Sequence, residues 1–388
     1  MTIEVILGAQ WGDEGESWLI SRPARRNSVA ELPPTFFSEL KELEAKGLAA
    51  VHDRILVSDR VNVLLDMHIA VDGLEEQELG EGAIGTTKRG NRTGVKLSDI
   101  FHPELFEEKV KRLADGYQKR FGELFKYDIK AELASFEDYR KTMRKYVVDG
   151  VSFMTSAQQS DAKIVVEGAN ALMLDIDYGS YPFVTSSSTT LAGIIGGLTL
   201  NPKNITETVG VVKASDTTRV GSGAFKTEDT GEIGTKLQEI GREWVMLHNI
   251  RGSQLLPLTR HRGRRPAADA DVDDLVVVKY SNSINYYTKL NLTKLDVLDT
   301  FETIKIAIAY KVDGQELDSY PADLKILEQA EVVYHEMPGW QTPTTNAKTF
   351  YDLPKKARDY VQYIEKFVGV KIKYIGTGPD REAMIQCA

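Results

Sequence analysis

The apolar and polar positions along the chain predict strands that alternate with helices. The chain opens with an apolar run, Val5–Leu7, that ends in a glycine-rich turn, as a buried strand would. Four later runs also predict short apolar strands, several ending in polar or glycine turns: IVVEGANALMLDIDYGSYPFVTSSS, ETVGVVKAS, DLVVVKYSNSIN and FVGVKIKYIGTGPD. Strands with helices between them favour an α/β fold with a large, mostly parallel central sheet flanked by helices.

Helical spacing of apolar residues marks other segments of the chain. A helix is predicted from about Thr35 to Gly47, with the glycine as its stop. The runs 55–58 and 61–65 are either buried strands or a strand and the start of a helix, because periodicity does not separate these two. Two long amphipathic helices are predicted from the following sets: Phe106, Val110, Leu113, Tyr117 and Phe121, then Phe136, Tyr139, Met143, Tyr146 and Val147.

Two segments show neither a strand period nor a helix period. Residues 16–34 contain several arginines and the pair Pro33–Pro34, which predicts a loop. Residues 245–273 contain a basic cluster followed by the stretch AADADVDD. A chain of 388 residues is long enough for one large α/β domain or two ordinary ones. Because we find no repeat and no clear linker, we predict a single domain over residues 1–388.

Composition narrows the class of protein. A net charge of −9 argues against a nucleic-acid binder, although a local basic pocket for a phosphorylated substrate remains compatible with it. The single cysteine, Cys387, excludes an internal disulfide framework and suits a reducing compartment. No apolar run approaches the length of a membrane span, and no basic leader precedes the first strand. We therefore expect a cytoplasmic protein without nucleic-acid or membrane partners.

The turn after the first strand carries the first candidate chemistry. In VILGAQWGDEG, a buried strand leads into a turn with two carboxylates, Asp13 and Glu14. Such a turn can offer backbone N–H groups and an acid to a nucleotide. It should next supply a lysine to meet the phosphates, but the chain continues with Glu16, Ser17 and Trp18.

Several motifs in order resemble those of the adenylosuccinate synthetase family. The resemblance begins at VILGAQWGDEG and continues through IGTT (84–87), VEGANALMLDIDYGSYPFVTSS (166–187), TTRVG (217–221), NLTKLDVLDTF (291–301) and GTGPDRE (376–382). Asn170 in VEGAN is typical of the eukaryotic branch, since bacterial members usually carry glutamine there. The resemblance implies the family's P-loop-like fold and its reaction, the GTP-dependent joining of L-aspartate to IMP in AMP biosynthesis.

The resemblance assigns the central role to Asp13. In the family, this aspartate removes the N1 proton of IMP and is a ligand of Mg²⁺, the expected cofactor. A carboxylate suits both tasks, because it accepts a proton and is a hard oxygen ligand. The O6 oxygen then attacks the γ-phosphate of GTP, and the aspartate amine displaces phosphate from 6-phosphoryl-IMP. By the same resemblance Glu14 contacts IMP, while Gly12 and Gly15 contact GTP. Taken alone, Asp13 would be an exposed acid in a loop.

The resemblance also implies a set of IMP-binding residues. Thr87, Asn170 and Thr185 match family positions that bind IMP, and their hydroxyl and amide groups offer the donors and acceptors that it needs. Each could instead be a polar residue at the end of a strand. Arg92 matches an arginine that reaches the IMP phosphate of the neighbouring subunit in a homodimer, the expected assembly. Arg262 matches another arginine at the IMP site, with a solvated basic run as the alternative.

The GTP site is implied by two further motifs. Lys294, Leu295 and Asp296 resemble the family's guanine-reading element, in which the aspartate accepts hydrogen bonds from the guanine N1–H and 2-amino groups. The turn Gly376–Thr377–Gly378 matches a second loop at the guanine end, where glycine permits close backbone approach. A simple strand-to-helix turn is the alternative for that loop. Arg264 belongs to the same basic cluster as Arg262 and would contact GTP.

Parts of the family pattern are missing from the chain. The family's GDEGKGK is replaced by GDEGESW, and neither the GHT segment with its catalytic histidine nor the GKGIGP loop is present. His68 lies in a stretch that matches a helical region, so we interpret it as structural. The lysine of GDEGKGK and the catalytic histidine of the GHT segment are each worth on the order of a hundredfold in reaction rate. Because both are missing, we expect impaired activity. The alternative is a non-catalytic, guanine-nucleotide-binding degenerate paralogue.

Overall fold

The computed structural model describes residues 2–11, 33–79, 94–185, 187–214, 223, 225–228, 231–241, 272–380 and 382–387. These residues divide into two compact units. Unit 1 lies within residues 20–164 and 195–204, and unit 2 lies within residues 2–19, 165–194 and 205–388. Every helix among the described residues is too short or too polar to cross a lipid bilayer.

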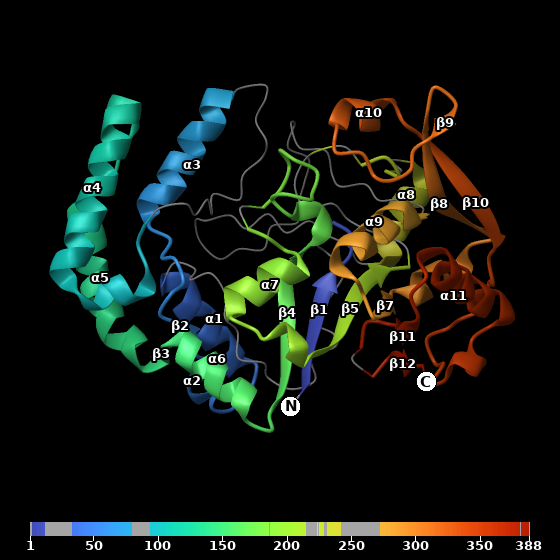
Figure 1. Cartoon of the computed structure of the whole chain (residues 1–388), viewed down its shortest axis with the longest axis horizontal. Coiled ribbons are helices and arrows are strands. Elements are labelled where there is room, and N and C mark those ends of the chain that lie inside the picture. The colour runs from blue at the N-terminus through green and yellow to red at the C-terminus, as the bar shows by residue number, and fades with distance from the viewer. Residues whose placement is uncertain are drawn as a thin grey trace. The chain divides into compact units, whose positions relative to one another are not determined.

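A six-stranded sheet forms the centre of unit 2 (Figure 1). Its order is β12–β11–β7–β5–β1–β4, and β1 pairs with β5, β5 with β7, and β7 with β11, all in parallel. Only the edge strand β12 is paired in the antiparallel sense among these described pairs. The strands are β1 Thr2–Gly8, β4 Lys163–Ala171, β5 Ile205–Lys213, β7 Lys289–Thr293, β11 Ile372–Gly376 and β12 Met384–Gln386. The predicted α/β fold with a mostly parallel central sheet is confirmed.

The strand sequences are apolar because the sheet is buried on both faces. Val5, Ile6 and Leu7 of β1 are buried in succession, and so are Val211 and Val212 of β5. An unbroken apolar run is the pattern of a strand covered on both faces, whereas a half-exposed strand would alternate. The central strands therefore hold the core of unit 2, and the loops at their ends are the places left for polar chemistry.

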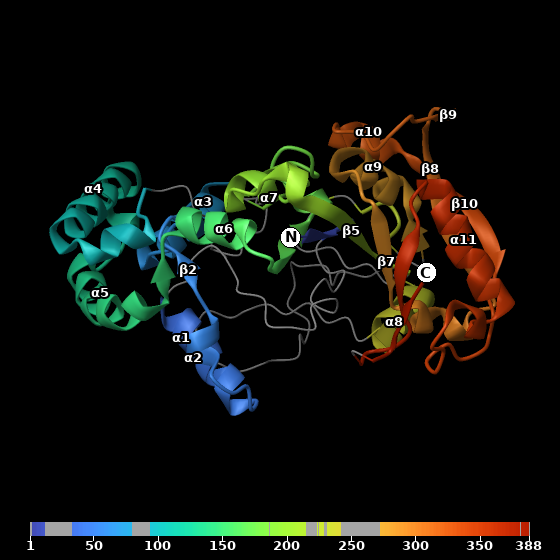
Figure 2. The same cartoon turned by 60° about the horizontal axis from the view of Figure 1, so that its bottom comes forward.

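Helices and a second sheet complete unit 2. The second sheet has the order β10–β8–β6, with β9 paired to β8. Its strands are β6 Val272–Asp274, β8 Thr303–Val312, β9 Gln315–Glu316 and β10 Glu331–Pro338. The α-helices are α7 Leu191–Leu198, which ends in unit 1, α8 Glu232–Gly241, α9 Leu275–Asn285, α10 Leu324–Gln329 and α11 Lys355–Val368. The 3₁₀ helices are η6 Leu172–Leu174, η8 Leu295–Thr300 and η9 Phe350–Asp352. Helix α11 lies beside β10, where the rings of Tyr363 and His335 stack with centroids 4.4 Å apart (Figure 2).

The prediction of a strand in DLVVVKYSNSIN is wrong, because this segment forms α9. The β-branched residues favour a strand, but Asp274 caps the helix by accepting a hydrogen bond from the Val277 backbone N–H at 3.3 Å. Val278, Ser281 and Asn285 are buried at helical spacing, and the Asn285 side chain accepts a hydrogen bond from the Leu191 N–H. The cap and the tertiary contacts override the local strand preference.

Unit 1 is mainly helical. Its elements are α1 Pro33–Ala45, α2 Val51–Arg54, β2 Val57–Ser58, α3 Asp66–Leu79, η3 Leu97–Phe101, α4 Pro103–Phe121, η4 Gly122–Leu124, α5 Ile129–Met143, η5 Arg144–Tyr146, β3 Val147–Val148, α6 Gly150–Gln159 and η7 Pro202–Asn204. Helices α4 and α5 lie side by side, with the rings of Phe106 and Phe136 at 4.8 Å (Figures 1 and 2). The helices predicted near 35–47 and 106–121 are confirmed. The next helix ends at Met143, so Tyr146 and Val147 lie beyond it, and Pro33–Pro34 opens α1 instead of closing a loop.

Two buried titratable side chains accept hydrogen bonds from backbone N–H groups at the N-terminus of α3. His68 accepts a hydrogen bond from the Leu65 N–H through Nδ1 at 3.0 Å, and burial lowers its pKa to about 4. This local role agrees with the structural interpretation of His68. Both carboxylate oxygens of Glu132, on α5, accept from the Asp66 N–H at 3.1 Å. Burial raises the pKa of Glu132 to about 7, so its ionised form is disfavoured in the folded chain.

The Glu132 site predicts a pH-dependent stability. The pKa of Glu132 in the folded chain lies above its ordinary value of 4.5. The uncharged carboxyl therefore contributes fully to the stability of the fold below pH 4.5, and this contribution is lost as the pH rises through 7. Glu132→Gln keeps an acceptor for the Asp66 N–H and removes the charge. We expect the variant to exceed the unchanged chain in free energy of unfolding by on the order of 2 kcal/mol at pH 8, with a much smaller gain at pH 5.

Urea unfolding followed by the helical circular dichroism signal, at pH 5 and pH 8, measures this difference. Glu137→Gln is the matched control, since Glu137 lies on the same helix but is exposed. A gain of equal size at both pH values would contradict the assigned role of Glu132.

Candidate functional site

The carboxyl ends of the central strands meet at one edge of the sheet. The parallel pairing brings together the ends of β1, β5, β7 and β11. Just past these ends, the Met173 N–H donates to the Gln10 carbonyl at 3.0 Å, which places the end of β4 at the same edge. The Ala214 N–H donates to the Thr293 carbonyl at 2.9 Å, joining the residues that follow β5 and β7. Five strands therefore deliver their following loops to one place.

Strand β1 lies at the point where the order of the strands in the sheet reverses. The chain forms β4 on one side of β1 and then continues to β5 on the other side, from where the order proceeds to β7 and β11 (Figure 1). In open α/β sheets, ligands bind in the crevice outside such a point, because the loops on its two sides lead away from each other. The turn that begins after β1 is the one that the sequence predicts to carry Asp13.

Gln10 joins three strands immediately before that turn. Its side chain is fully buried, and its Oε1 accepts a hydrogen bond from the Lys213 N–H at the end of β5, at 2.9 Å. Its backbone carbonyl accepts from Met173, which follows β4. The neighbouring Trp11 is also buried and packs edge-on against Phe225, with centroids 4.5 Å apart. Sequence reasoning missed this role of Gln10, although a polar residue between an apolar strand and a glycine turn is a usable signal.

The predicted IMP residues that the structure describes lie at and after β4. Asn170 lies at the penultimate position of β4 and is partly buried. Thr185 is partly buried and its N–H donates to the Leu174 carbonyl at 2.8 Å, which brings the loop back to the end of the strand. The buried carboxylate of Asp175 holds this loop by accepting from the Asp177 and Thr189 N–H groups. Asp175 therefore positions the loop, a role that sequence reasoning did not assign.

The predicted guanine-binding residues lie together at the ends of β7 and β11. Lys294 follows β7 in the left-handed conformation, with φ of 58°, and begins η8, which contains Leu295 and Asp296. A Cβ on Gly376 would lie 3.4 Å from the Thr293 Cα and 3.5 Å from the Lys294 backbone N, at ordinary van der Waals distance, so the two turns lie side by side. The Lys294 ammonium donates to the Gly241 carbonyl at 2.8 Å, at the end of α8.

Thr377 stabilises the second of these turns. It is fully buried, and its N–H donates to the Ala383 carbonyl at 2.8 Å. Gly378 is partly exposed. The structure thus brings the motifs around Asp296 and Gly376 to neighbouring strand ends, although 80 residues separate them in the chain.

Comparison with known proteins identifies the family. The adenylosuccinate synthetase profile matches residues 26–385. The chain belongs to the adenylosuccinate synthetase family. A synthetase from Fusarium vanettenii is 70% identical over 100% of both chains, and one from Pyricularia oryzae is 53% identical over 98% of this chain and 99% of its own. The structure of a fully ligated adenylosuccinate synthetase from Plasmodium falciparum matches with a TM-score of 0.88, at 31% identity and 100% coverage of both chains.

These comparisons confirm the resemblance inferred from the motifs, including its eukaryotic type, and the expected class of enzyme, a ligase. The Fusarium alignment spans 432 positions, whereas this chain has 388 residues. The alignment therefore contains at least 44 positions at which this chain has no residue. Because both chains are covered in full, these gaps are internal, in agreement with the prediction that segments of the synthetase pattern are missing.

Several predicted residues of the synthetase site lie outside the described residues, and so do most of the segments 16–34 and 245–273. These residues are Gly12, Asp13, Glu14, Gly15, Thr87, Arg92, Arg262 and Arg264. Among the residues that the structure does describe, no group of three or more histidine, cysteine, aspartate or glutamate side chains could hold a metal ion. The predicted Mg²⁺ ligand, Asp13, is not among those searched.

The position of Gln10 predicts a measurable contribution to stability. Gln10→Met keeps the side-chain volume but removes the acceptor of the buried Lys213 N–H. We expect the free energy of unfolding to fall by about 1–3 kcal/mol, the cost of a buried donor without a partner. Urea unfolding measures this change.

Gln118→Met is the control, because the Gln118 side chain is exposed and donates to the Gly122 carbonyl at 2.6 Å. There water can replace the lost hydrogen bond, so a change within about 0.5 kcal/mol is expected. Equal losses in the two variants would refute the role given to Gln10.

Proposed function

We propose that the chain is an adenylosuccinate synthetase that joins L-aspartate to IMP, using GTP, in AMP biosynthesis. The observation that carries the proposal is the common edge of the sheet, where β4 presents Asn170 and β7 and β11 present Asp296 and Gly376 on the two sides of β1. A site of this kind offers one end to a purine monophosphate and the other to a guanine nucleotide. Family membership supports the same assignment.

In the proposed reaction, Asp13 takes the N1 proton of IMP, and the O6 oxygen attacks the γ-phosphate of GTP, whose bond to the β-phosphate breaks so that GDP leaves. The 6-phosphoryl-IMP formed in this step then reacts with the amine of L-aspartate, and phosphate leaves. Asn170, Thr185, Thr87, Glu14 and the two arginines Arg92 and Arg262 would hold IMP. Gly12, Gly15, Arg264 and the two guanine-binding turns would hold GTP.

Mg²⁺ fits the proposed site through the chemistry of its donors. It prefers oxygen ligands and is commonly held by one or two carboxylates together with substrate phosphates. Asp13 would supply the carboxylate. The ion would supply positive charge to the phosphates, while the residues of the chain bind and orient the nucleotides.

The missing segments predict a slow enzyme. GDEGESW contains no lysine where the family has one, and residues 16–34 contain no histidine. Each of these groups is worth on the order of a hundredfold in rate. The second candidate function is therefore a non-catalytic relative that binds guanine nucleotides. The gaps in the Fusarium alignment favour it, because they remove residues while both guanine-binding turns remain.

The remaining properties extend the proposal. We infer a homodimer in which Arg92 of one subunit reaches the IMP of the other, a single domain over residues 1–388, and a cytoplasmic location without nucleic-acid or membrane partners. The net charge of −9 supports the exclusion of nucleic acid.

The proposed reaction predicts that IMP is converted only when both GTP and L-aspartate are present. The absorbance change of the purine measures this conversion. The missing lysine and histidine lead us to expect a rate on the order of a hundredfold or more below that of the Fusarium synthetase, assayed in parallel.

GTP binding is measured alongside by calorimetry. Binding without turnover would reject the enzymatic function in favour of the non-catalytic relative. Turnover near that of the Fusarium protein would instead reject the impairment.

The guanine assignment predicts a selective loss in Asp296→Asn. An asparagine presents an N–H group where guanine also presents donors, so we expect GDP to bind about tenfold or more weakly. IDP lacks the 2-amino group, so its dissociation constant should change less. The ratio of the IDP to the GDP dissociation constant (the IDP-to-GDP ratio) should therefore fall. Calorimetric titration with the two nucleotides measures this ratio.

Asp318→Asn is the control, since Asp318 is an exposed aspartate of unit 2. An IDP-to-GDP ratio that stays at its original value in Asp296→Asn would refute the assignment of Asp296.

A further inference from the structure

Asp299 makes a concentrated set of hydrogen bonds beside the guanine-binding turn. Its Oδ1 accepts from the Trp340 indole N–H at 2.8 Å and from the Thr344 hydroxyl at 2.9 Å. Its Oδ2 accepts from the Thr344 backbone N–H at 2.7 Å. Three donors from one turn, residues 340–344, therefore converge on one carboxylate of η8. Nothing in the proposed reaction uses Asp299 directly.

The geometry of a 3₁₀ helix links Asp299 to Asp296. Such a helix has three residues per turn, so side chains at positions i and i+3 lie above one another. Asp296 and Asp299 are three residues apart within η8 and therefore occupy one stripe of it. A rotation of η8 that moved Asp299 away from the 340–344 turn would redirect Asp296 by the same angle.

A second contact, made by the residue just before the 340–344 turn, fixes the turn against the end of η8. The Gly339 N–H donates to the Glu302 carbonyl at 2.7 Å. A Cβ on Gly339 would lie only 1.8 Å from the Phe301 carbonyl oxygen, so the backbone of the turn lies directly against the residues that follow η8. The Lys356 ammonium holds the same turn from α11, donating to the Gly339 carbonyl at 2.9 Å. The turn is thus a fixed support for Asp299.

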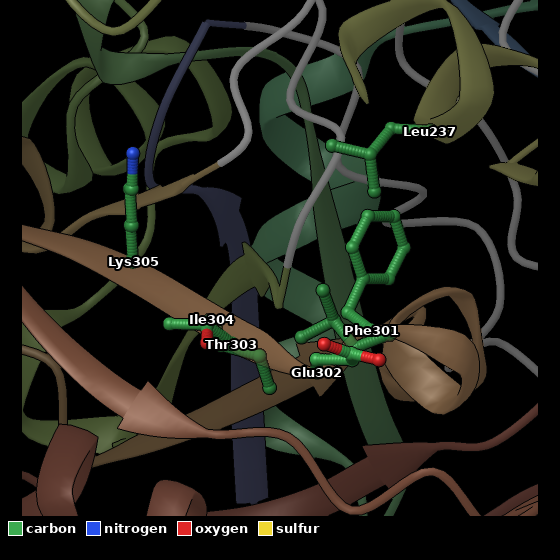
Figure 3. A pocket seen from close by; sticks show the side chains of 7 residues that line it. Leu237, Phe301, Glu302, Thr303, Ile304 and Lys305 are labelled. Carbon is green, nitrogen blue, oxygen red and sulfur yellow. The ribbon is translucent and has the colours of Figure 1, made fainter. Parts of the chain in front are cut away.

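Apolar packing holds the other two stripes of η8, where Leu295, Val297 and Leu298 are buried. A cavity of about 230 Å³ opens beside Leu298 and Phe301. Figure 3 shows the cavity, with Leu237 of α8 and Phe301 on one side and the residues that begin β8 on the other. Apolar packing is non-directional, whereas a hydrogen bond depends on the orientation of its two groups. The hydrogen bonds of Asp299 therefore add a directional restraint to the packing of η8.

We propose that Asp299 is a positioning residue for guanine recognition, which sets the direction of the Asp296 carboxylate by anchoring η8 to the 340–344 turn. The inference rests on the proposed function, because it requires Asp296 to face guanine. It extends that function by assigning nucleotide selectivity to a residue that does not touch the nucleotide.

The test compares GDP and IDP binding in variants of the full chain. Asp299→Asn places an N–H group among three donors and should release η8. We expect the ratio of the IDP to the GDP dissociation constant to fall about fivefold or more, toward the value of Asp296→Asn. ADP is titrated in parallel as a nucleotide that Asp296 does not recognise, and its affinity should stay within about twofold.

If the role of Asp299 is purely structural, its substitution weakens the binding of GDP, IDP and ADP together and leaves the ratios of their dissociation constants unchanged. Such a result overturns the proposal. The double variant Asp296→Asn with Asp299→Asn adds a second criterion: if Asp299 acts through Asp296, the double variant has the ratio of Asp296→Asn alone. Independent, multiplied effects in the double variant also overturn it.

Two milder variants keep the test decisive if Asp299→Asn fails to fold. Thr344→Val removes one hydroxyl donor and Trp340→Phe removes the indole N–H, while both keep an apolar side chain at the site. Their combination should lower the IDP-to-GDP ratio in the same direction. Lys355→Met is the matched control, because Lys355 is exposed on the same helix α11 and pairs with Asp359. An equal effect of Lys355→Met would overturn the assigned role.

The failure of this inference differs from the failure of the proposed function. If the unchanged chain does not distinguish GDP from IDP, or if Asp296→Asn leaves their ratio unchanged, the guanine site itself is wrong and the positioning role falls with it. If Asp296→Asn lowers the ratio and the Asp299 variants do not, the guanine site stands and only the role of Asp299 is rejected.

Discussion

The alignment of the strand ends is the constraint on which the rest of unit 2 depends. Parallel pairing requires that β1, β5, β7 and β11 finish at one edge, and Gln10 holds the end of β1 between the residues that follow β4 and the end of β5. A strand that slipped by one residue would turn every side chain to the opposite face. The loops that carry the proposed chemistry can be placed accurately because this register is buried and hydrogen-bonded.

The same edge explains why the proposed site is divided between distant parts of the chain. Asn170 and Thr185 belong to the end of β4, whereas Asp296 and Gly376 belong to β7 and β11. Each motif alone is compatible with an ordinary strand end or turn. They can form one site because the strand order brings them to the same edge of the sheet, with β1 between them.

The supporting residues of the site are less visible in the sequence than its motifs. Asp299 lies in NLTKLDVLDTF, three residues after Asp296, the aspartate proposed to bind guanine, yet its partners Trp340 and Thr344 are more than forty positions away. Asp175 acts in the same way on the loop after β4, and Asp274 caps α9 while accepting a hydrogen bond from Tyr310. Burial raises the pKa of Asp274 to about 6, and the hydrogen bonds that it accepts oppose this rise. Each of these carboxylates orients a backbone segment.

The sequence alone determined the class of fold, the family and the identity of the motifs, because these depend on local patterns. The apolar runs of β1 and β5, the helical spacing around Phe106 and the ordered motifs can all be recognised without knowing what they contact. Only the tertiary structure decided that residues 275–285 form a helix, since the cap at Asp274 and the bond from Leu191 to Asn285 outweigh a β-branched run. It also decided which residues support the site. The hydrogen bonds of Gln10 and Asp299 join segments far apart in the chain, and local sequence carries no information about such partners.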